Sequence, residues 1–318
     1  MGLKIAIQMD HIKDVKIEKD STFSLALEAQ KRGHTVYHYL APSLRLENGE
    51  VTTRAQKMEV RREKGNHYTL GEDEVIDLRN DIDIVVMRQD PPFAMRYITA
   101  THILDHIKND TLVTNDPTEV RNAPEKLLVT HFPDLAPETL ITSDSDAIRD
   151  FYARHKDIIL KPLYGNGGEQ IYHIDEKGSN LNALLEMFEA FYQEPIIAQK
   201  YIPEAKNGDK RIILVDGEPV GAVLRVPSKN DERANFDAGG SGVKTTLTAR
   251  ELEICERIKP TLKKLGLIFT GIDIIGDYLT EINVTSPTGI QHINKLDGIC
   301  IEAMLWDVYE AKHKELIS

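Results

Sequence analysis

Cysteine, long apolar runs and several catalytic signatures are scarce or absent in this sequence, and each shortage excludes a class of protein. Two cysteines, Cys255 and Cys300, lie far apart in 318 residues, so we expect reduced thiols in a cytoplasmic protein. The longest apolar runs, such as Ile82 to Met87, have the length of a strand and exclude a transmembrane helix. The first residues lead directly into a predicted strand, without a signal-peptide pattern.

Basic residues are also fewer than acidic residues. The chain has 39 lysines and arginines against 51 aspartates and glutamates, a net charge of −12, which argues against a general binder of nucleic acid or anionic membranes. An anionic ligand would therefore need a local basic pocket. The Walker sequence, the HRD and DFG motifs of kinases and a CxxC pair are missing too. The length and the 41% hydrophobic content predict a soluble globular protein of two or three domains.

The start of the chain alternates strands and helices. Two short apolar strands flank a helix that is capped at Asp20 or Ser21, which predicts a parallel α/β unit. A further apolar strand, residues 82–88, ends at Arg88 and is followed by Asp90. Ligands bind at the carboxyl ends of strands in open α/β sheets, so both residues are candidate ligand contacts. The alternative is a structural turn with an exposed arginine.

An interior lysine and a glycine-rich loop follow each other near the middle of the chain. Lys161 lies between apolar neighbours in a predicted strand, where a lysine needs an anionic partner. The loop after it contains Gly165, Gly167 and Gly168, and such a backbone can approach a phosphate closely. An ordinary tight hairpin would explain the loop alone. Together with the lysine, the loop predicts phosphate binding.

Local positive charge and a long irregular segment come next. Lys210, Arg211 and Arg225 lie in a predicted hairpin and supply positive charge, although ordinary strand ends carry such charges as well. Residues 226–244 show no apolar periodicity and end in a run that is rich in glycine, residues 239–242. A loop of this length is more often functional or disordered than structural. Because glycine permits hinging, we expect a lid.

Residues 269–284 read as a two-stranded hairpin whose alternation sorts side chains by face. One face of the second strand holds Leu279, Glu281 and Asn283. The other face holds Thr280, Ile282 and Val284. Directly opposed residues of an antiparallel pair share a face. Pairing Asp273 with Glu281 therefore makes the apolar faces of both strands coincide.

That pairing has two consequences. It requires a loop of odd length, most simply residues 276–278, because a two-residue loop would turn a carboxylate toward the core. It also makes Asp273, Glu281 and Asn283 converge as oxygen ligands, the set that suits Mg²⁺ completed by phosphate oxygens. The alternative is a solvent-facing side of an amphipathic hairpin. With the lysines and the glycine loop, the set indicates phosphoryl transfer.

Motifs along the whole chain resemble a known family. They are Met9-Asp10, Lys19-Asp20-Ser21, Met87-Arg88-x-Asp90-Pro91-Pro92-Phe93, Asn122-x-x-Glu125-Lys126-Leu127, residues 158–163 with Gly165-x-Gly167-Gly168, Gly208-Asp209-Lys210-Arg211 and residues 279–287. On these motifs the chain is similar to the bacterial glutathione synthetases, which are ATP-grasp ligases.

The resemblance implies an α/β (α+β) fold in which a parallel α/β domain precedes a two-lobed ATP-grasp fold. Residues 1–120 would form the N-terminal, pre-ATP-grasp domain on the substrate side. Residues 121–202 would form the central lid domain, and residues 203–318 the C-terminal ATP-grasp domain with the metal hairpin and the mobile loop 226–244. ATP would lie between the last two.

The resemblance also implies a reaction. ATP phosphorylates the carboxylate of γ-glutamylcysteine, and the amine of glycine attacks the acyl phosphate to give glutathione, ADP and phosphate. Mg²⁺, or Mn²⁺ in its place, would be the cofactor. The partners would be these small molecules, with neither nucleic acid nor membrane, and the assembly would be a homo-oligomer, a tetramer, in the cytoplasm.

Family roles carry over onto matching positions. The phosphates would be held by Lys126, Lys161, Gly165, Gly167 and Gly168. Adenine would be bound by Gln199, Lys200, Tyr201 and Ile202, with Asp209 nearby. The metal ligands would be Asp273, Glu281 and Asn283. The residues that stabilise or cover the reacting groups would be Arg211, Arg225, Arg233 and Gly240. The dipeptide would be held by Ser21, Arg88, Asp90 and Ser286.

Two other functions stay open. One is an ATP-grasp carboxylate–amine ligase with a different acceptor, because the ATP half of the site is better specified than the peptide half. The other is a nucleotide-binding regulator without turnover, against which the complete set of lysines and metal ligands argues. The sequence departs from relatives at Gln89, at Ser241 and in residues 228–231, which affects peripheral charge and lid mobility.

Overall fold

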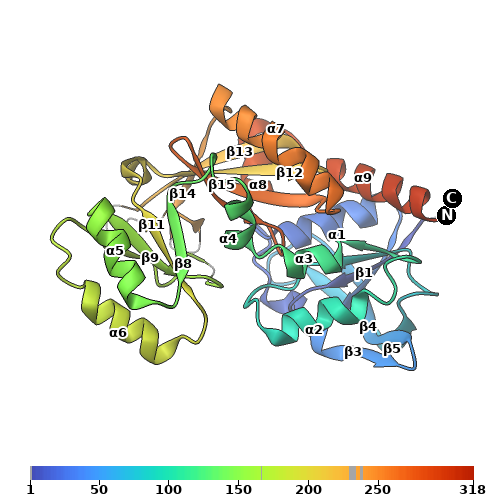
Figure 1. Cartoon of the computed structure of the whole chain (residues 1–318). Helices are drawn as coiled ribbons and strands as arrows, with labels where there is room; N and C mark the ends of the chain where they lie inside the picture. Colours follow the sequence, from blue (N-terminus) through green and yellow to red (C-terminus); the bar gives the residue numbers. More distant parts are fainter. Residues whose placement is uncertain (1, 166, 229–233, 237–238) are drawn as a thin grey trace.

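The structure, a computed structural model of the chain, describes every residue except 1, 166, 229–233 and 237–238. Its strands form three sheets that follow one another along the sequence. The first and third sheets adjoin, and the second forms a lobe of its own (Figure 1). The predicted α/β class is confirmed.

The first sheet has parallel strands at its centre, as the start of the sequence predicts. Its order is β3-β4-β2-β1-β6-β7, with β5 paired to β4. The parallel strands are β1 (Lys4–Gln8), β2 (Thr35–Tyr39), β6 (Ile84–Met87) and β7 (Leu112–Thr114). The antiparallel additions are β3 (Leu44–Glu47), β4 (Glu50–Val60) and β5 (Tyr68–Asp77).

Helices cover both faces of this sheet. They are α1 (Ser21–Lys31), α2 (Met95–Leu104) and α3 (Pro117–Asn122), together with α9 (Ile301–Leu316) from the end of the chain. The side chain of Asp20 accepts a hydrogen bond from the N–H of Phe23, which confirms the predicted cap of α1. Ile5 packs in the same cluster as the α1 and α9 residues, while Ala6 faces the cluster that includes α2. The alternation is that of a strand covered on both sides.

The second sheet is antiparallel, with the order β10-β9-β11-β8. Its strands are β8 (Thr139–Thr142), β9 (Ile158–Pro162), β10 (Tyr172–Ile174) and β11 (Ile196–Lys200). The helices α5 (Ser145–His155) and α6 (Leu181–Phe191) pack on one face against Leu160 and Ala198. The neighbouring positions Lys161 and Gln199 therefore point to the opposite, uncovered face.

The third sheet has the order β14-β13-β12-β15-β16. Its strands are β12 (Asp209–Val215), β13 (Glu218–Val226), β14 (Ser241–Lys244), β15 (Phe269–Ile275) and β16 (Tyr278–Asn283). The helix α7 (Ala249–Lys264) packs on one face, and α8 (Ile290–Asp297) and α9 pack on the other. The short helix α4 (Glu125–Leu128) contacts β16. Short 3-10 turns occupy Ile12–Asp14, Ala41–Ser43, Val129–His131 and Pro203–Asn207.

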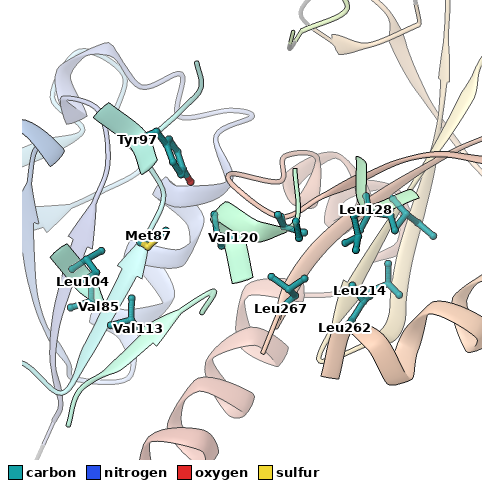
Figure 2. Close-up of a cluster of buried hydrophobic side chains, with 14 of the residues drawn as sticks. Val85, Met87, Tyr97, Leu104, Val113, Val120, Leu128, Leu214, Leu262 and Leu267 are labelled. Carbon is teal, nitrogen blue, oxygen red and sulfur yellow. The ribbon is translucent and has the colours of Figure 1, made fainter. Parts of the chain in front are cut away.

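Two hydrophobic clusters join the first and third sheets. Figure 2 shows one of them running from Val85 and Leu104 past Val120 to Leu214 and Leu262. The second sheet has a separate cluster, formed with α5 and α6. The second lobe is therefore the part of the molecule that packing attaches least firmly to the rest.

The hairpin of β15 and β16 has the predicted pairing but not the predicted loop. Asp273 lies opposite Glu281, as expected, yet Ile275 pairs with Tyr278 across the two-residue loop 276–277. A bulge in β16 at Thr280, directly before Glu281, restores the register that this short loop would otherwise lose. The expectation of a three-residue loop is wrong, because a bulge and an odd loop shift the register equally.

The bulge also changes which residues face the core. Leu279 packs in the hydrophobic cluster with Ile274, and Thr280 lines the cavity described below. Both had been expected on the opposite faces. The hydroxyl of Thr280 donates to the carbonyl of Asp273 at 3.0 Å, which fixes the bulge in place. No helix in the described ranges combines the length and apolarity that a bilayer span requires.

Candidate active site

A cavity of about 990 Å³ lies where the uncovered face of the second sheet meets the third sheet and the loops of the first. Lys161 and Gln199 line it from the second sheet, and Arg211 and Asp273 from the third. Asp90, at the carboxyl end of β6, lines it from the first. The cavity thus reaches all three sheets and is large enough for a nucleotide and a further substrate.

Lys161 is the buried cation of this cavity. Its side chain is 6% exposed, and Nζ donates to Oε1 of Gln199 at 3.3 Å. Burial lowers the pKa of Lys161 to about 8, although Glu281 acts in the opposite direction. Gln199 in turn donates to the hydroxyl of Thr139 at 2.9 Å. Gln199 therefore holds the lysine in place, and an anion in the cavity would neutralise its positive charge.

A second lysine connects the glycine loop to the metal face. Lys126, at the start of the chain segment that enters the second lobe, donates from Nζ to the carbonyl of Gly165. Its Nζ also lies 3.6 Å from Oε1 of Glu281. Both predicted phosphate lysines therefore line one cavity.

The glycines of the loop are required by geometry. Gly168 has a φ of +73°, and a Cβ there would lie 2.5 Å from Oδ1 of Asn235. Asn235 Nδ2 donates to the carbonyl of Gly167, whose φ is +64°. A side chain at either position would be strained. Gly165, Gly167 and Gly168 line the cavity together, as phosphate binding requires.

The end of β11 forms another part of the wall. Gln199, Lys200, Tyr201 and Ile202 all line the cavity, as the sequence predicts. His173 of β10 stacks on Tyr201 with ring centroids 4.0 Å apart and also lines the cavity. Sequence reasoning missed His173. Its signal was the alternation of β10, in which Tyr172 and Ile174 pack in the core and His173 points away.

The predicted metal face carries two arginines. Arg211 donates to both oxygens of Asp273, at 2.5 and 2.8 Å. Arg225 Nη2 lies 3.0 Å from Asp273 Oδ2. Burial alone would raise the pKa of Asp273, but the two guanidinium groups hold it well below its ordinary value. Asp273 is therefore an ionised carboxylate at neutral pH.

The other members of that face lie beside Asp273. Asn283 Nδ2 is 3.4 Å from Asp273 Oδ2, and Glu281 lies opposite Asp273 in the sheet. All three line the cavity and offer oxygen donors, which fits a hard cation such as Mg²⁺. Asp209, expected near the ribose or phosphate, lines the cavity and binds Arg225 through both carboxylate oxygens, at 2.5 and 2.8 Å.

The four predicted dipeptide contacts divide into two pairs. Asp90 and Ser286 both line the cavity. Arg88 and Ser21 are not among the lining residues. Arg88 is 5% exposed and donates to Thr22 Oγ1 at 3.0 Å and to the carbonyl of Pro287 at 2.9 Å. These two residues lie behind the wall rather than in it.

The lid residues are described only in part. Arg233 lies outside the described residues, together with residues 229–232 and 237–238 of the same segment. Gly240 is described, and its N–H donates to the carbonyl of Asn235 at 3.1 Å. Phe236 stacks on His292 of α8 with centroids 4.2 Å apart. The described part of this segment therefore touches both the glycine loop and α8.

Glu125 is a further carboxylate in the cavity to which sequence reasoning gave no role. It accepts a hydrogen bond from the hydroxyl of Thr285 at 2.8 Å. Burial and the charge of Glu281 raise the pKa of Glu125. The sequence feature that could have identified Glu125 is its position directly before Lys126 in the matching motif. Asp10, Lys19 and His292 line the cavity as well and were likewise unassigned.

Comparisons with known proteins agree with this geometry. Residues 3–121 match the sequence model described as "Prokaryotic glutathione synthetase, N-terminal domain", and residues 125–298 match "Prokaryotic glutathione synthetase, ATP-grasp domain". A glutathione synthetase of Brucella melitensis is 57% identical over 98% of this chain and 100% of its own length. That of Mesorhizobium japonicum is 54% identical over 99% and 100%, and that of Salmonella typhimurium 42% identical over 98% and 99%.

Solved structures that resemble the chain share its fold at low sequence identity. D-cycloserine synthetase DcsG has a TM-score of 0.67 and 14% identity, covering 98% of this chain and 99% of its own. The ATP-grasp ligase PsnB, solved with a precursor variant, Mg and ADP, has a TM-score of 0.62 and 18% identity, covering 98% of each chain. From the two family models and the full-length relatives, the chain belongs to the prokaryotic glutathione synthetases, a family of ATP-dependent ATP-grasp ligases.

Proposed function

We propose that the chain joins γ-glutamylcysteine to glycine, with conversion of ATP to ADP and phosphate, through an acyl phosphate. The full-length relatives named glutathione synthetase support this reaction. The observation that carries it is the single cavity in which Lys126 and Lys161 face Asp273 and Glu281. Such a site can hold a polyphosphate and bring its terminal phosphoryl group to a carboxylate.

The chemistry requires activation because a carboxylate is a poor acyl donor. A carboxylate oxygen of the cysteine residue attacks the γ-phosphorus, the bond to the bridging oxygen breaks, and ADP leaves. The amine of glycine then attacks the carbonyl carbon and loses a proton. Phosphate departs with the former carboxylate oxygen. The acyl phosphate must be kept from water, which is the role we assign to the segment 226–244 with Arg233 and Gly240.

The nucleotide would lie against the second sheet. Lys126, Lys161 and the N–H groups of the loop with Gly165, Gly167 and Gly168 would hold the phosphates. The segment Gln199 to Ile202 would bind adenine through backbone groups, and Asp209 would lie toward the ribose or phosphates. The position of all these residues in one cavity supports the assignment.

Mg²⁺, or Mn²⁺ in its place, would be held by Asp273, Glu281 and Asn283. When bound, the cation would neutralise phosphate charge. Arg211 and Arg225, whose guanidinium groups already lie on this face, would stabilise charge on the transferring phosphoryl and acyl oxygens. Neutralisation by fixed cations in a buried site costs no reorganisation during the reaction.

The dipeptide would be held at the substrate end by Asp90 and Ser286, with Arg88 and Ser21 behind them. We further propose that the protein acts in the cytoplasm as a homotetramer. Analytical ultracentrifugation tests the assembly: a mass four times that of the 35.9 kDa chain supports it. A monomer at micromolar concentration would contradict it.

Release of ADP tests the proposed reaction. We expect turnover when γ-glutamylcysteine and glycine are both present and little with either alone, because the amine must complete the cycle. Mass spectrometry should identify glutathione as the product. Turnover with other amino acids and none with glycine would favour a ligase with a different acceptor. ATP binding without turnover for any pair would favour a nucleotide-binding regulator.

A further inference from the structure

A row of three side chains crosses the uncovered face of the second sheet. His173 of β10 pairs with Ile159 of β9, and Ile159 pairs with Gln199 of β11. Directly paired residues of antiparallel strands share a face, and all three side chains line the cavity. Gln199 begins the segment that we assign to adenine, and the phosphate lysine Lys161 lies two residues further along β9. The row therefore lies toward the base end of the proposed nucleotide site.

Asp157, directly before β9, contacts residues from both neighbouring strands. Nε2 of His173 lies 2.6 Å from Oδ1 of its carboxylate. Its carbonyl accepts the N–H of Tyr201, the residue after β11, at 3.1 Å. Because an ionised carboxylate can only accept, the imidazole N–H donates, which fixes the orientation of the His173 ring. Asp157 thus ties a ring of β10 to the backbone that follows β11.

The rings of His173 and Tyr201 complete a closed arrangement with Asp157. They stack with centroids 4.0 Å apart and an angle of 18° between their planes. Tyr201 is therefore held at two points, by its N–H on Asp157 and by its ring on His173. Tyr201 belongs to the segment that we assign to adenine, residues 199–202, and all four of these residues line the cavity. His173 thus acts on that segment through its ring.

We propose that His173 is a positioning residue for the nucleotide base. It holds Tyr201, and with it the backbone of residues 199–202, in the arrangement that receives adenine. The proposal rests on the proposed function, which places adenine at this segment. An arrangement that is fixed before ATP arrives lowers the entropy cost of binding. The effect of His173 therefore belongs in the affinity for ATP and not in the chemical step.

Two substitutions of His173 separate its ring from its hydrogen bond. His173→Ala loses both the stack and the contact with Asp157, so KM for ATP should rise about 5-fold, while kcat at saturating ATP and KM for γ-glutamylcysteine should stay within about 2-fold. His173→Phe keeps a ring over Tyr201 and should recover most of the affinity for ATP. An unchanged KM for ATP in His173→Ala, or a fall in kcat without a change in KM, would overturn the positioning role.

His155→Ala is the matched control within the same lobe. His155 also has an aromatic neighbour, Phe151, with ring centroids 4.3 Å apart, and a carboxylate neighbour, Glu138, 3.6 Å from its Nε2. It lies in α5 and is not among the residues that line the cavity. We expect His155→Ala to leave KM for ATP unchanged. The same rise in both variants would show that KM follows the stability of the lobe, and it would refute a specific role of His173.

Binding of ATP without peptide or glycine separates this role from the proposed reaction. Isothermal titration calorimetry with ATP and Mg²⁺ should give a dissociation constant about 5-fold higher for His173→Ala than for the unmodified protein. A protein that binds ATP but makes no glutathione would contradict the proposed function and leave this comparison intact. Equal dissociation constants, in a protein that makes glutathione, would contradict the positioning role alone.

Discussion

Lys161 shows how a single residue can be predicted from its neighbours in the sequence. A lysine between apolar residues in a strand predicts a buried cation, and the structure has it 6% exposed in the cavity wall. The alternation of β9 explains why it faces the cavity, since Leu160 packs in the core. The same reasoning could not find that Gln199, on the neighbouring strand, orients it.

Replacement of Lys161 should stabilise the empty protein. The pKa of Lys161 is about 8 in the folded state, below its ordinary 10.5, so folding with a charged lysine is penalised. The penalty is full below pH 8 and fades as pH rises toward 10.5, where both states lose the proton. Lys161→Met should therefore increase the free energy of unfolding by up to about 3 kcal/mol at pH 7.

Urea unfolding at several pH values measures this effect. The gain in Lys161→Met should shrink between pH 8 and 10.5. Stabilisation by ATP should be weaker at every pH, because the proposed phosphate contact would be gone. If Lys161→Met were less stable than the unmodified protein at pH 7, burial of the charged lysine would not be destabilising the empty protein, and the prediction would be wrong. Lys177→Met, at an exposed lysine of the same lobe that does not line the cavity, is the comparison for ordinary surface charge.

Glu281 is the sharpest single test of the metal face. Glu281→Gln removes a charge but keeps the shape, so the fold should stay intact while Mg²⁺-dependent kcat/KM falls at least about 100-fold. Asp277→Asn, in the exposed loop of the same hairpin, should leave activity unchanged. Full activity of Glu281→Gln across a Mg²⁺ titration would refute the assignment of this ligand.

Some residues of the site could not be assigned from the sequence. Arg88 and Ser21 were predicted to contact substrate, yet they lie behind the wall, because a strand end fixes where the backbone goes but not which layer a long side chain reaches. Asp10 belonged to a matching motif that gave it no role, and His173 carried no pattern beyond alternation. Their proximity to the site comes from contacts between distant segments, which alternation does not encode.

The hairpin of β15 and β16 shows the same limit for an element. Matching faces predict that Asp273 opposes Glu281, and they do so whether the extra residue is in the loop or in a bulge. In the structure the extra residue is Thr280, in a bulge, so Leu279 packs in the core. Local alternation could not decide between the two, because both leave the carboxylates paired.

Deletions of single residues distinguish a bulge from a longer loop. Without Thr280 the strand would pair regularly, with Leu279 in the core and Glu281 still opposite Asp273. Without Leu279 the pairing would be the same, but Thr280 would take the place of a buried leucine. We expect the second variant to be less stable than the first by about 2–3 kcal/mol. Equal stability in thermal unfolding would contradict the bulge.

Across the whole molecule, the hydrophobic clusters group the sheets differently from the order of the sheets along the sequence. The first and third sheets share two hydrophobic clusters, while the second sheet has one of its own. The division into residues 1–120, 121–202 and 203–318 therefore stays a prediction. What the sequence could predict was the succession of units; which of them share a core depends on contacts between segments far apart.

Hydrogen exchange tests this division. Amides of β9 and β11 should open with a smaller free energy than those of β1 and β15, because the second lobe can unfold without breaking the shared clusters. ATP with Mg²⁺ should slow exchange in β9 and β11 most, since the nucleotide would join that lobe to the third sheet. Uniform exchange across all sheets would contradict a separately opening lobe.

Transfer of an oxygen atom tests the acyl-phosphate reaction most directly. γ-Glutamylcysteine carrying ¹⁸O in both oxygens of its cysteine carboxylate is turned over with glycine and ATP, and the phosphate released is analysed by mass spectrometry. The proposed reaction predicts one ¹⁸O in each phosphate and the other in the new amide of glutathione. Phosphate without ¹⁸O, with glutathione formed at the normal rate, would contradict it.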